Sequence, residues 1–384
     1  MKIYTFLLLI SVIIGSCIRD TKSILKVDLK DFSGDYVLHL DDLMTDIRVV
    51  KLPTTDEILV PQGYESFVGE KFILILSYGS ILQFDDKGDF IRKLAREGNG
   101  PGEITYISSF DVDDEEEKLY IHSANDRGSL FVFNLITGEV LPKIELPDNM
   151  LERFIIDGDH ILWIDGPYPE EPPKIYRQFY TMSFSGDSIS TRINTDMHDN
   201  YIIQGRMKFI KRVKNKVYFL DQINDTLFTI DGTEQIPFCV LNVDDRYNFN
   251  SNLEGNIPLI DILSENKIKL MNQKLDVKKG PGKMWMMGDR DKKDYLWNPK
   301  ANTLNYISAY YNDFFMTEVD DLKFASRGDF GYLEYSAMDF KALLSQTLGN
   351  AGLNSEKRKQ LMELDLTITE QDNPIFLIGH VINN

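Results

Sequence analysis

The chain has 384 residues, of which 43% are hydrophobic and 11% aromatic, and this composition excludes an intrinsically disordered protein. Its 60 acidic residues outnumber 42 basic ones, and the resulting net charge of −18 argues against nucleic acid and anionic lipid headgroups as partners. The length accommodates two or three ordinary domains or one large repeat domain.

The first 16 residues have the pattern of a secretory signal peptide. Lys2 precedes an apolar run from Ile3 to Ile14 that is too short for a comfortable membrane span. The following Gly15, Ser16 and Cys17 complete a segment that resembles a bacterial lipobox. We therefore expect lipidation of Cys17; a plain signal peptide with an incidental cysteine is the alternative.

The mature chain is expected to begin with a lipidated flexible tether over residues 17–35, followed by one folded domain over residues 36–384. The tether is rich in Lys, Asp and Ser. Cys239 is the other cysteine, so acylation of Cys17 leaves no partner for an intrachain disulfide. Its apolar neighbours predict a buried small side chain rather than a nucleophile.

A glycine turn recurs every 46 to 50 residues, each time after a strand-like run. A four-stranded antiparallel sheet needs about 40 to 50 residues and cannot bury both faces alone, so such units stack around an axis. The period therefore predicts an all-β fold, a β-propeller. The runs and their glycines are Phe84 to Gly88, Phe133 to Gly138, Met182 to Gly186 and Phe228 to Gly232.

A second series of short apolar runs gives the number of blades. Six runs precede the turns and predict six blades: Phe72 to Leu76, Leu119 to His122, Ile161 to Ile164, Val217 to Leu220, Met284 to Met287 and Tyr332 to Tyr335. The N-terminal run Ile47 to Leu52 has no blade of its own. We expect it to pair with the sixth blade, because closure of the ring removes exposed sheet edges.

The fifth unit is about 20 residues longer than the others. Apolar residues between Leu259 and Leu275 have helical spacing, so we expect a helical insertion in this unit. Short C-terminal helices are expected from Ser355, as a candidate N-cap, to Leu364, and from Phe340 to Leu348.

The stretch from Phe84 to Thr105 resembles the first blade of six-bladed β-propeller lipoproteins of Bacteroidetes-type bacteria, relatives of the NHL and TolB-like propellers. The residues that carry the resemblance are Phe84, Asp85, Gly88, Phe90, Ile91, Lys93, Gly98, Gly100, Pro101, Gly102 and Glu103. The ending from Asp372 to Ile382 is similar to the closing strand of that family. The resemblance implies a binding or scaffold protein of the cell envelope, lipid-anchored in the outer membrane, and no uniform activity comes with it.

One constellation of residues is a candidate binding site. In a propeller, the loops between second and third strands and those between blades lie on one face, where ligands usually bind. Arginines placed there could hold a carboxylate, a sulfate or sugar hydroxyls; separate surface ion pairs are the alternative. The candidates are Arg96, Arg127, Arg153, Arg206 and Arg290, with Tyr168 as a stacking ring.

Other motifs have simpler interpretations. The loop from Gly98 to Glu103 lacks the Lys-Ser/Thr of a phosphate-binding loop and is interpreted as a connection between blades. The acidic run from Asp111 to Glu117 fails the EF-hand pattern and is interpreted as a turn. Five scattered histidines show no metal-ligand spacing, although a zinc site at the axis stays open. No nucleophile elbow is present, so no catalytic residue, cofactor or metal is assigned.

Three functions remain open. The favoured one is a non-enzymatic, monomeric propeller that is tethered to the membrane through its lipid and binds a glycan, a peptide or an envelope protein. The second is an envelope hydrolase or lyase with an active site assembled across blades. The third is a structural component of an outer-membrane complex.

Overall fold

A computed structural model gives the arrangement of the chain. The residues that it describes are 24–61, 64–98, 100, 103–115, 117–126, 128–146, 154–163, 176–194, 209–214, 216–221, 225–231, 234–245, 254–279, 285–287 and 292–383.

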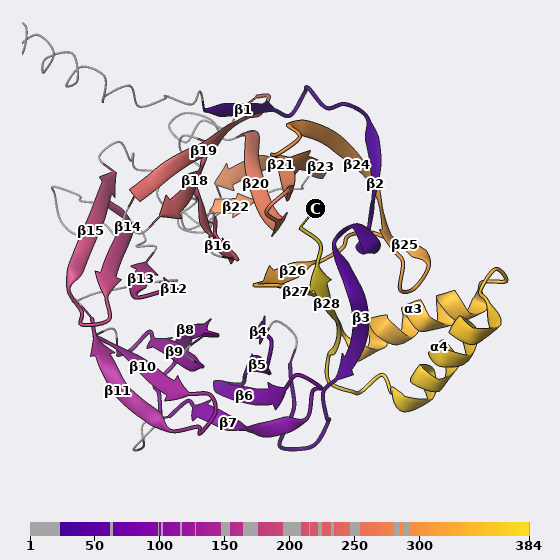
Figure 1. Ribbon diagram of the computed structural model, residues 1–384, viewed down its shortest axis with the longest axis horizontal. Helices are drawn as coiled ribbons and strands as arrows, with labels where there is room; N and C mark the ends of the chain where they lie inside the picture. The colour runs from indigo at the N-terminus through magenta and orange to yellow at the C-terminus, as the bar shows by residue number, and fades with distance from the viewer. Residues whose placement is uncertain are drawn as a thin grey trace, which may run out of the picture.

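In this part of the chain, six sheets surround a central axis, and the predicted six-bladed propeller is confirmed (Figure 1). Blade 1 contains β4 (Glu65–Val68), β5 (Phe72–Ser77), β6 (Ser80–Asp85) and β7 (Phe90–Arg96). Blade 2 contains β8 (Ile107–Asp113), β9 (Lys118–Ser123), β10 (Ser129–Asn134) and β11 (Val140–Glu145). Blade 3 contains β12 (Phe154–Asp157), β13 (His160–Trp163), β14 (Tyr176–Ser183) and β15 (Ser188–Asn194).

The second half of the ring has longer or augmented sheets. Blade 4 contains β16 (Phe209–Val213), β17 (Lys216–Asp221), β18 (Thr226–Asp231) and β19 (Glu234–Asn242). Blade 5 contains β20 (Glu254–Ser264), β21 (Lys267–Lys279), β23 (Lys292–Asn298) and β24 (Thr303–Asn312), with β22 (Trp285–Met287) paired to β21 and β25 (Thr317–Val319) to β24. Blade 6 contains β26 (Ala325–Arg327), β27 (Phe330–Tyr335), β28 (Ile375–Val381) and β3 (Met44–Lys51).

The recurring glycines mark the turns between third and fourth strands, as predicted. Gly88, Gly138 and Gly186 have φ angles of 91°, 79° and 87°, which side chains with a Cβ rarely adopt. Gly232 lies outside the described residues. Among the described residues, the inner strands of blade 1 bury side chains on both faces, toward blade 2 and toward blade 6. In the seam of blades 1 and 2, for example, Leu74 and Ile81 pack with Val112 and Ile121.

Ring closure by the N-terminus is confirmed. Strand β3 is the outer strand of blade 6 and pairs antiparallel with β28, so that Val50 faces Phe376 and Lys51 faces Ile375. Gly379 is needed at this seam, because a Cβ there would lie 2.5 Å from the carbonyl oxygen of Thr45. Closure joins residues near both ends of the chain into one sheet and completes blade 6.

The segment expected to be a flexible tether is ordered in its second half, and the propeller begins earlier than residue 36. Strand β1 (Leu25–Asp28) adds a parallel outer strand to β19, and β2 (Asp35–His39) adds one to β24. A 3-10 turn, η1 (Leu40–Asp42), then leads into β3. We call residues 25–39 the N-terminal strap. The strap is held because Val27 and Leu29, each 4% exposed, join the core between blades 4 and 5.

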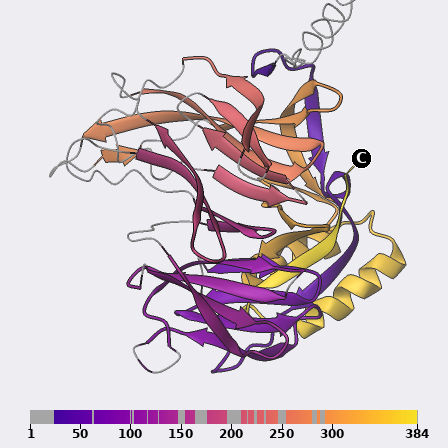
Figure 2. The same ribbon diagram turned by 60° about the vertical axis from the view of Figure 1, so that its left-hand side comes forward.

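The expected helical insertion in the fifth unit is wrong. Residues 254–279 form the long antiparallel hairpin of β20 and β21, and these strands reach farther from the ring than their neighbours (Figure 2). Ile260 and Ile262, like Ile268 and Leu270, have the two-residue period of a strand and are buried. Because both faces of this sheet are buried, apolar residues also occur at the positions between these, and the combined spacing resembles that of a helix. The second strand of blade 5 is therefore β21, and the run Met284 to Met287 does not occupy that position.

The two predicted C-terminal helices are confirmed with longer bounds. Helix α3 (Ala337–Gly349) begins after Ser336, whose side chain accepts a hydrogen bond from the Asp339 amide. Helix α4 (Ser355–Thr367) is capped by Asn354, so Ser355 is its first residue rather than its cap. Both helices pack outside blade 6, where Phe340, Leu344 and Leu361 join the core between blades 5 and 6 (Figure 1).

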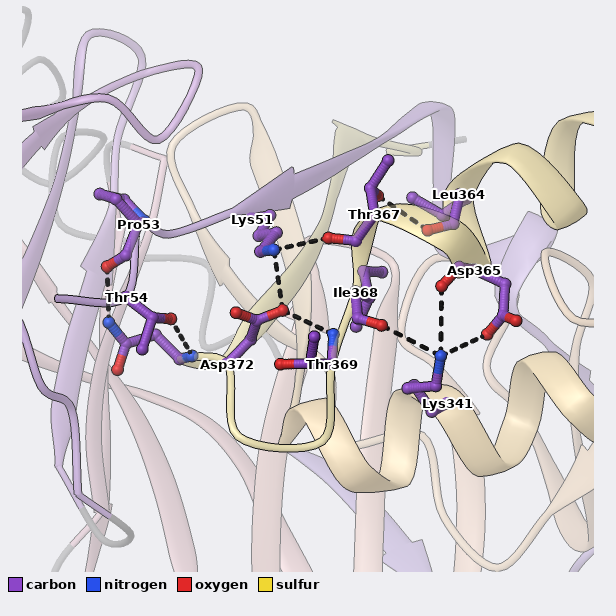
Figure 3. A network of polar contacts seen from close by, with 11 residues as sticks. Lys51, Pro53, Thr54, Lys341, Leu364, Asp365, Thr367, Ile368, Thr369 and Asp372 are labelled. Carbon is purple, nitrogen blue, oxygen red and sulfur yellow. Dashed lines mark hydrogen bonds and ion pairs between the residues drawn. The ribbon is translucent and has the colours of Figure 1, made fainter.

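Two lysines hold the C-terminal end of α4, one from the closing strand β3 and one from α3 (Figure 3). Lys51 of β3 binds the Asp372 carboxylate at 2.7 Å and donates to the carbonyl oxygen of Thr367 at 2.6 Å. Lys341 of α3 donates to the Ile368 carbonyl at 3.0 Å and to the Asp365 side chain at 2.8 Å. Cations at these positions satisfy the free carbonyls at the end of α4 and favour its negative dipole end.

Candidate functional site

The six innermost strands run in the same direction along the axis and define two faces of the ring. These strands are β4, β8, β12, β16, β20 and β26 (Figure 1). We call the face at which they begin the upper face and the face at which they end the lower face. Connections between blades, and those between second and third strands, lie on the upper face.

The lower end of the axis holds a charged network centred on Arg327. Its guanidinium donates to Asp111 of blade 2 at 2.5 Å and to the carbonyl of Val112, and it lies 4.7 Å from the centre of the Phe67 ring of blade 1. The other Asp111 oxygen accepts from the amide of Ile156 in blade 3 at 2.8 Å. One arginine and one carboxylate thus connect blades 6, 1, 2 and 3.

The network is structural in character. Burial alone lowers the pKa of Arg327, but Asp111 and Asp114 outweigh it and hold this pKa above its usual value. A further ion pair joins Arg212 of blade 4 to Asp157 of blade 3 at 3.5 Å. Because Asp111 is 5% exposed and fully engaged, it offers no free ligand. The interpretation of the acidic run Asp111 to Glu117 as a turn is only partly right, because Asp111 and Asp113 belong to strand β8 and the turn begins at Asp114.

The upper face over blades 1 and 2 presents two tyrosines in the left-handed backbone region. Tyr78 has a φ of 45° and is 75% exposed, and Tyr106 has a φ of 56° and is 58% exposed. This region costs an ordinary residue roughly 1–2 kcal/mol. Neither ring is buried to offset that strain, and strained residues of this kind concentrate at functional sites.

The strain at Tyr78 arises from a tight turn. Ser77 pairs with Ser80, and the two residues between them, Tyr78 and Gly79, both have positive φ. Such hairpins normally carry Asn-Gly or Asp-Gly, because Asn and Asp tolerate this conformation. The hydroxyl of Ser77 donates to the carbonyl of Leu59 at 2.5 Å and holds this exposed leucine beside the turn.

Tyr106 follows the glycine-rich connection, which joins blades 1 and 2 as predicted. The Gly100 amide donates to Glu103 Oε2 at 2.8 Å, and the Gly98 amide donates to the carbonyl of Ile104 at 3.0 Å. A Cβ on Gly98 would collide with the Glu103 carboxylate. Because these amides are occupied within the loop, they do not form a cradle for a phosphate.

The two tyrosines belong to one backbone scaffold. The Glu97 amide donates to the carbonyl of Gly79 at 2.6 Å, and Glu97 also forms a bridge with Ile104. Two strand spacings, about 10 Å, therefore separate the turn of Tyr78 from the segment that leads into Tyr106. We call the exposed residues of this region the upper tyrosine surface; they are Leu59, Tyr78, Arg96 and Tyr106.

Arg96 is the one member of the predicted binding set that the structure describes. It ends β7, is exposed, and lies at the upper face, paired across the strands with Ser80. Arg127, Arg153, Arg206, Arg290 and Tyr168 lie outside the described residues, as does Cys17. The sequence reasoning missed Tyr78 and Tyr106. An aromatic residue before Gly79, in a two-residue gap between apolar runs, was the available signal.

A serine and a histidine meet near this surface without forming a catalytic pair. Ser108 Oγ lies 3.0 Å from His122 Nδ1 and donates to the carbonyl oxygen of His122 at 2.9 Å. The single hydroxyl proton is thus used on the carbonyl, and His122 is only 1% exposed. Among the described residues no group of three metal-binding side chains occurs, and no helix is both long and apolar enough to cross a membrane.

The burial of Cys239 agrees with its predicted role. The side chain is 0% exposed, and burial raises the pKa of its thiol to about 12. A thiol with this pKa carries almost no thiolate at neutral pH, so it is a core residue rather than a nucleophile.

Comparisons with known proteins place the chain among propellers. A model of a family described as a domain of unknown function, DUF4934, matches residues 25–380. A crystal structure of a Bacteroides fragilis protein described as exported is similar over 92% of this chain and 99% of that one, with a TM-score of 0.63 and 16% identity. Two further structures are more distant. BamB from Moraxella catarrhalis has a TM-score of 0.40 and 10% identity, with 76% of this chain and 84% of that one covered. U3-55K has a TM-score of 0.44 and 12% identity, with 87% of this chain and 98% of that one covered. No curated protein matches.

Proposed function

We propose that the chain, which belongs to the DUF4934 family of domains of unknown function, is a cell-envelope protein that binds a partner without catalysing a reaction. The observation that carries the proposal is the upper tyrosine surface, where Tyr78 and Tyr106 combine backbone strain with exposure. Tyrosine supplies large contact area at a small entropic cost, and it is enriched at the centres of interfaces.

The proposed partner is an envelope protein that docks on this surface. Arg96 adds a guanidinium for a carboxylate of the partner, and Leu59 adds an apolar contact. The location rests on the signal-peptide pattern of residues 1–16 and on the similarity to a protein described as exported. We propose that diacylglycerol on Cys17 anchors the protein in the outer membrane; the lipobox-like segment that ends at Cys17 supports this anchor.

Site-specific photo-crosslinking in intact cells tests the docking surface. A photoreactive amino acid at position 78 should give one discrete crosslinked product, and Tyr106→Ala should abolish it. The matched control is the same amino acid at position 159, because the Asp159 side chain is 87% exposed in a turn of the lower face. Equal products from positions 78 and 159, or none from position 78, would contradict the proposal.

The anchor has a separate test. Metabolic labelling with a fatty-acid analogue should label the wild-type protein and leave Cys17→Ala unlabelled. Label that persists in Cys17→Ala would show that the lipobox assignment is wrong, without bearing on the upper tyrosine surface.

A further inference from the structure

The outer edge of blades 4 and 5 carries a concentration of exposed apolar side chains. Strands β1 and β2 of the N-terminal strap are the outermost strands of these two blades (Figure 1). Of the 15 exposed large apolar residues in the described part of the chain, four lie between residues 24 and 37. We call them the apolar rim; they are Ile24, Leu25, Phe32 and Val37, with exposed fractions of 46%, 36%, 43% and 40%. Grouped apolar exposure of this kind marks a contact surface.

The strap presents the apolar rim on a firmly held backbone. Asp28 accepts a hydrogen bond from Asn242 Nδ2 at 2.6 Å, which fixes β1 to blade 4. The centre of the Phe32 ring lies 5.9 Å from that of Tyr295 and 6.0 Å from that of Tyr306, both in blade 5. Phe32 is therefore held in place by aromatic contacts while 43% of it stays exposed. The apolar rim is a preformed surface.

The length of the chain before the strap keeps the apolar rim close to the membrane. Six residues lie between Cys17, the proposed site of diacylglycerol, and Ile24. A fully extended chain covers at most about 25 Å over these seven steps. The first residue of the apolar rim thus lies within that distance of the lipid anchor. A tether this short makes contact with the lipid surface intramolecular, so a small apolar surface is sufficient to maintain it.

The charge of the segment also fits a lipid surface. Residues 24–37 contain two lysines and three aspartates, a net charge of −1, whereas the whole chain carries −18. Lys30 in turn pairs with Asp244, which follows β19. Zwitterionic headgroups neither attract nor repel such a segment strongly, and anionic headgroups offer it no gain.

We propose that the apolar rim rests on a zwitterionic lipid surface and holds the propeller edge-on, with its axis parallel to the membrane. This orientation depends on the lipid anchor proposed above. Blades 1 and 2 lie across the axis from blades 4 and 5 (Figure 1). The upper tyrosine surface, which belongs to blades 1 and 2, is then on the half of the ring remote from the membrane, where an envelope protein can reach it.

Fluorescence quenching in vesicles tests the orientation. The lipidated variant Ser33→Cys carries an environment-sensitive fluorophore at this exposed position and is reconstituted into phosphatidylcholine–phosphatidylethanolamine vesicles that contain nitroxide lipids. Only the introduced thiol reacts, because Cys17 is acylated and Cys239 is buried. The emission from position 33 should shift to the blue and be quenched. Lys87→Cys, exposed in a turn of blade 1 across the ring, is the control that should show neither effect.

Substitutions in the apolar rim identify the contact. Ile24→Glu combined with Val37→Glu places two carboxylates there and should abolish the quenching at position 33. Ile136→Glu combined with Val140→Glu makes the same change at residues that are 48% and 55% exposed in blade 2, and the quenching should persist. Quenching that survives the first pair of substitutions would refute contact through the apolar rim.

The remaining outcomes separate the orientation from the anchor. Protein that does not float with the vesicles would refute the anchor and with it the orientation. Floating protein with an unquenched label at position 33 would refute the orientation alone. A blue shift that needs no vesicles and grows with protein concentration would show that a second copy covers the apolar rim, and would equally overturn the proposal. None of these results depends on Tyr78 or Tyr106.

Discussion

At the scale of single residues, Tyr78 is an exposed aromatic side chain at a strained backbone position. The turn between β5 and β6 requires two consecutive positive φ angles, and the chain places a bulky aromatic residue at the first. An asparagine there would satisfy the same backbone with less strain. The fold alone therefore does not explain Tyr78, which is consistent with the binding role proposed for it.

We predict that Tyr78→Asn stabilises the protein and weakens partner binding. Relief of the left-handed strain should raise the free energy of unfolding by about 1 kcal/mol, measured by urea denaturation. Tyr78→Phe is the matched control, because it retains both the strain and the ring and should leave stability unchanged. A destabilised Tyr78→Asn would show that the ring makes contacts that stabilise the fold.

A second prediction concerns Cys239. Because burial raises its thiol pKa to about 12, the folded protein should not react with iodoacetamide at pH 8, and alkylation should follow global unfolding. Mass spectrometry of Cys17→Ala after timed alkylation measures this without interference from a second thiol. Rapid modification under native conditions would refute the buried assignment.

At the scale of secondary-structure elements, the structure of a segment is predicted correctly when its local sequence pattern is compatible with only one conformation. Gly88, Gly138 and Gly186 were correctly placed because a positive φ selects glycine at a fixed position of each repeat. The C-terminal helices were also recognisable, although the cap of α4 is Asn354. The hairpin of β20 and β21 was misread, since burial on both faces hides the alternation of a strand.

The strap could not be predicted from its own residues. Its many polar side chains are typical of a linker, and its order depends on Val27 and Leu29 meeting a core built about 200 residues later. Likewise, Tyr106 acquires its position from the glycine-rich connection before it. The dependence of the strap on residues far along the chain is invisible to local pattern reasoning, whereas Arg96 could be placed because it directly ends a strand.

The attachment of the helices gives a prediction at this scale. Lys341 donates to the carbonyls of Asp365 and Ile368 and to the Asp365 carboxylate. Lys341→Met should therefore lower the free energy of unfolding by about 1–2 kcal/mol. Lys359→Met is the control, because the side chain of Lys359 is 78% exposed and its 3.8 Å pair with Glu363 contributes little. Equal effects of both substitutions would contradict the proposed role of Lys341.

At the scale of the whole molecule, the lower network couples distant blades through Arg327. Removal of one partner from a buried ion pair is more damaging than removal of both, because the remaining charge stays buried. We predict that Arg327→Met lowers the free energy of unfolding by about 3–5 kcal/mol.

Asp111→Asn should partly rescue this variant. The asparagine oxygen can still accept from the Ile156 amide, which Asp111 does at 2.8 Å, and no buried charge remains. Thermal denaturation of the two single variants and the double variant forms a complete cycle. Additive losses in the double variant would mean that the two groups do not act as a pair.

Ring closure also determines at which stage of its synthesis the protein can fold. Asn373 donates to the carbonyl of Pro53, 320 positions earlier, and β3 has no antiparallel partner until β28 is present. A ribosome releases the N-terminal segment first, yet that segment must wait for almost the entire chain before it can take its place. Synthesis and folding are thus separated in time by the topology itself. A chain that stays open until its last strand arrives is well suited to transport across a membrane before it folds.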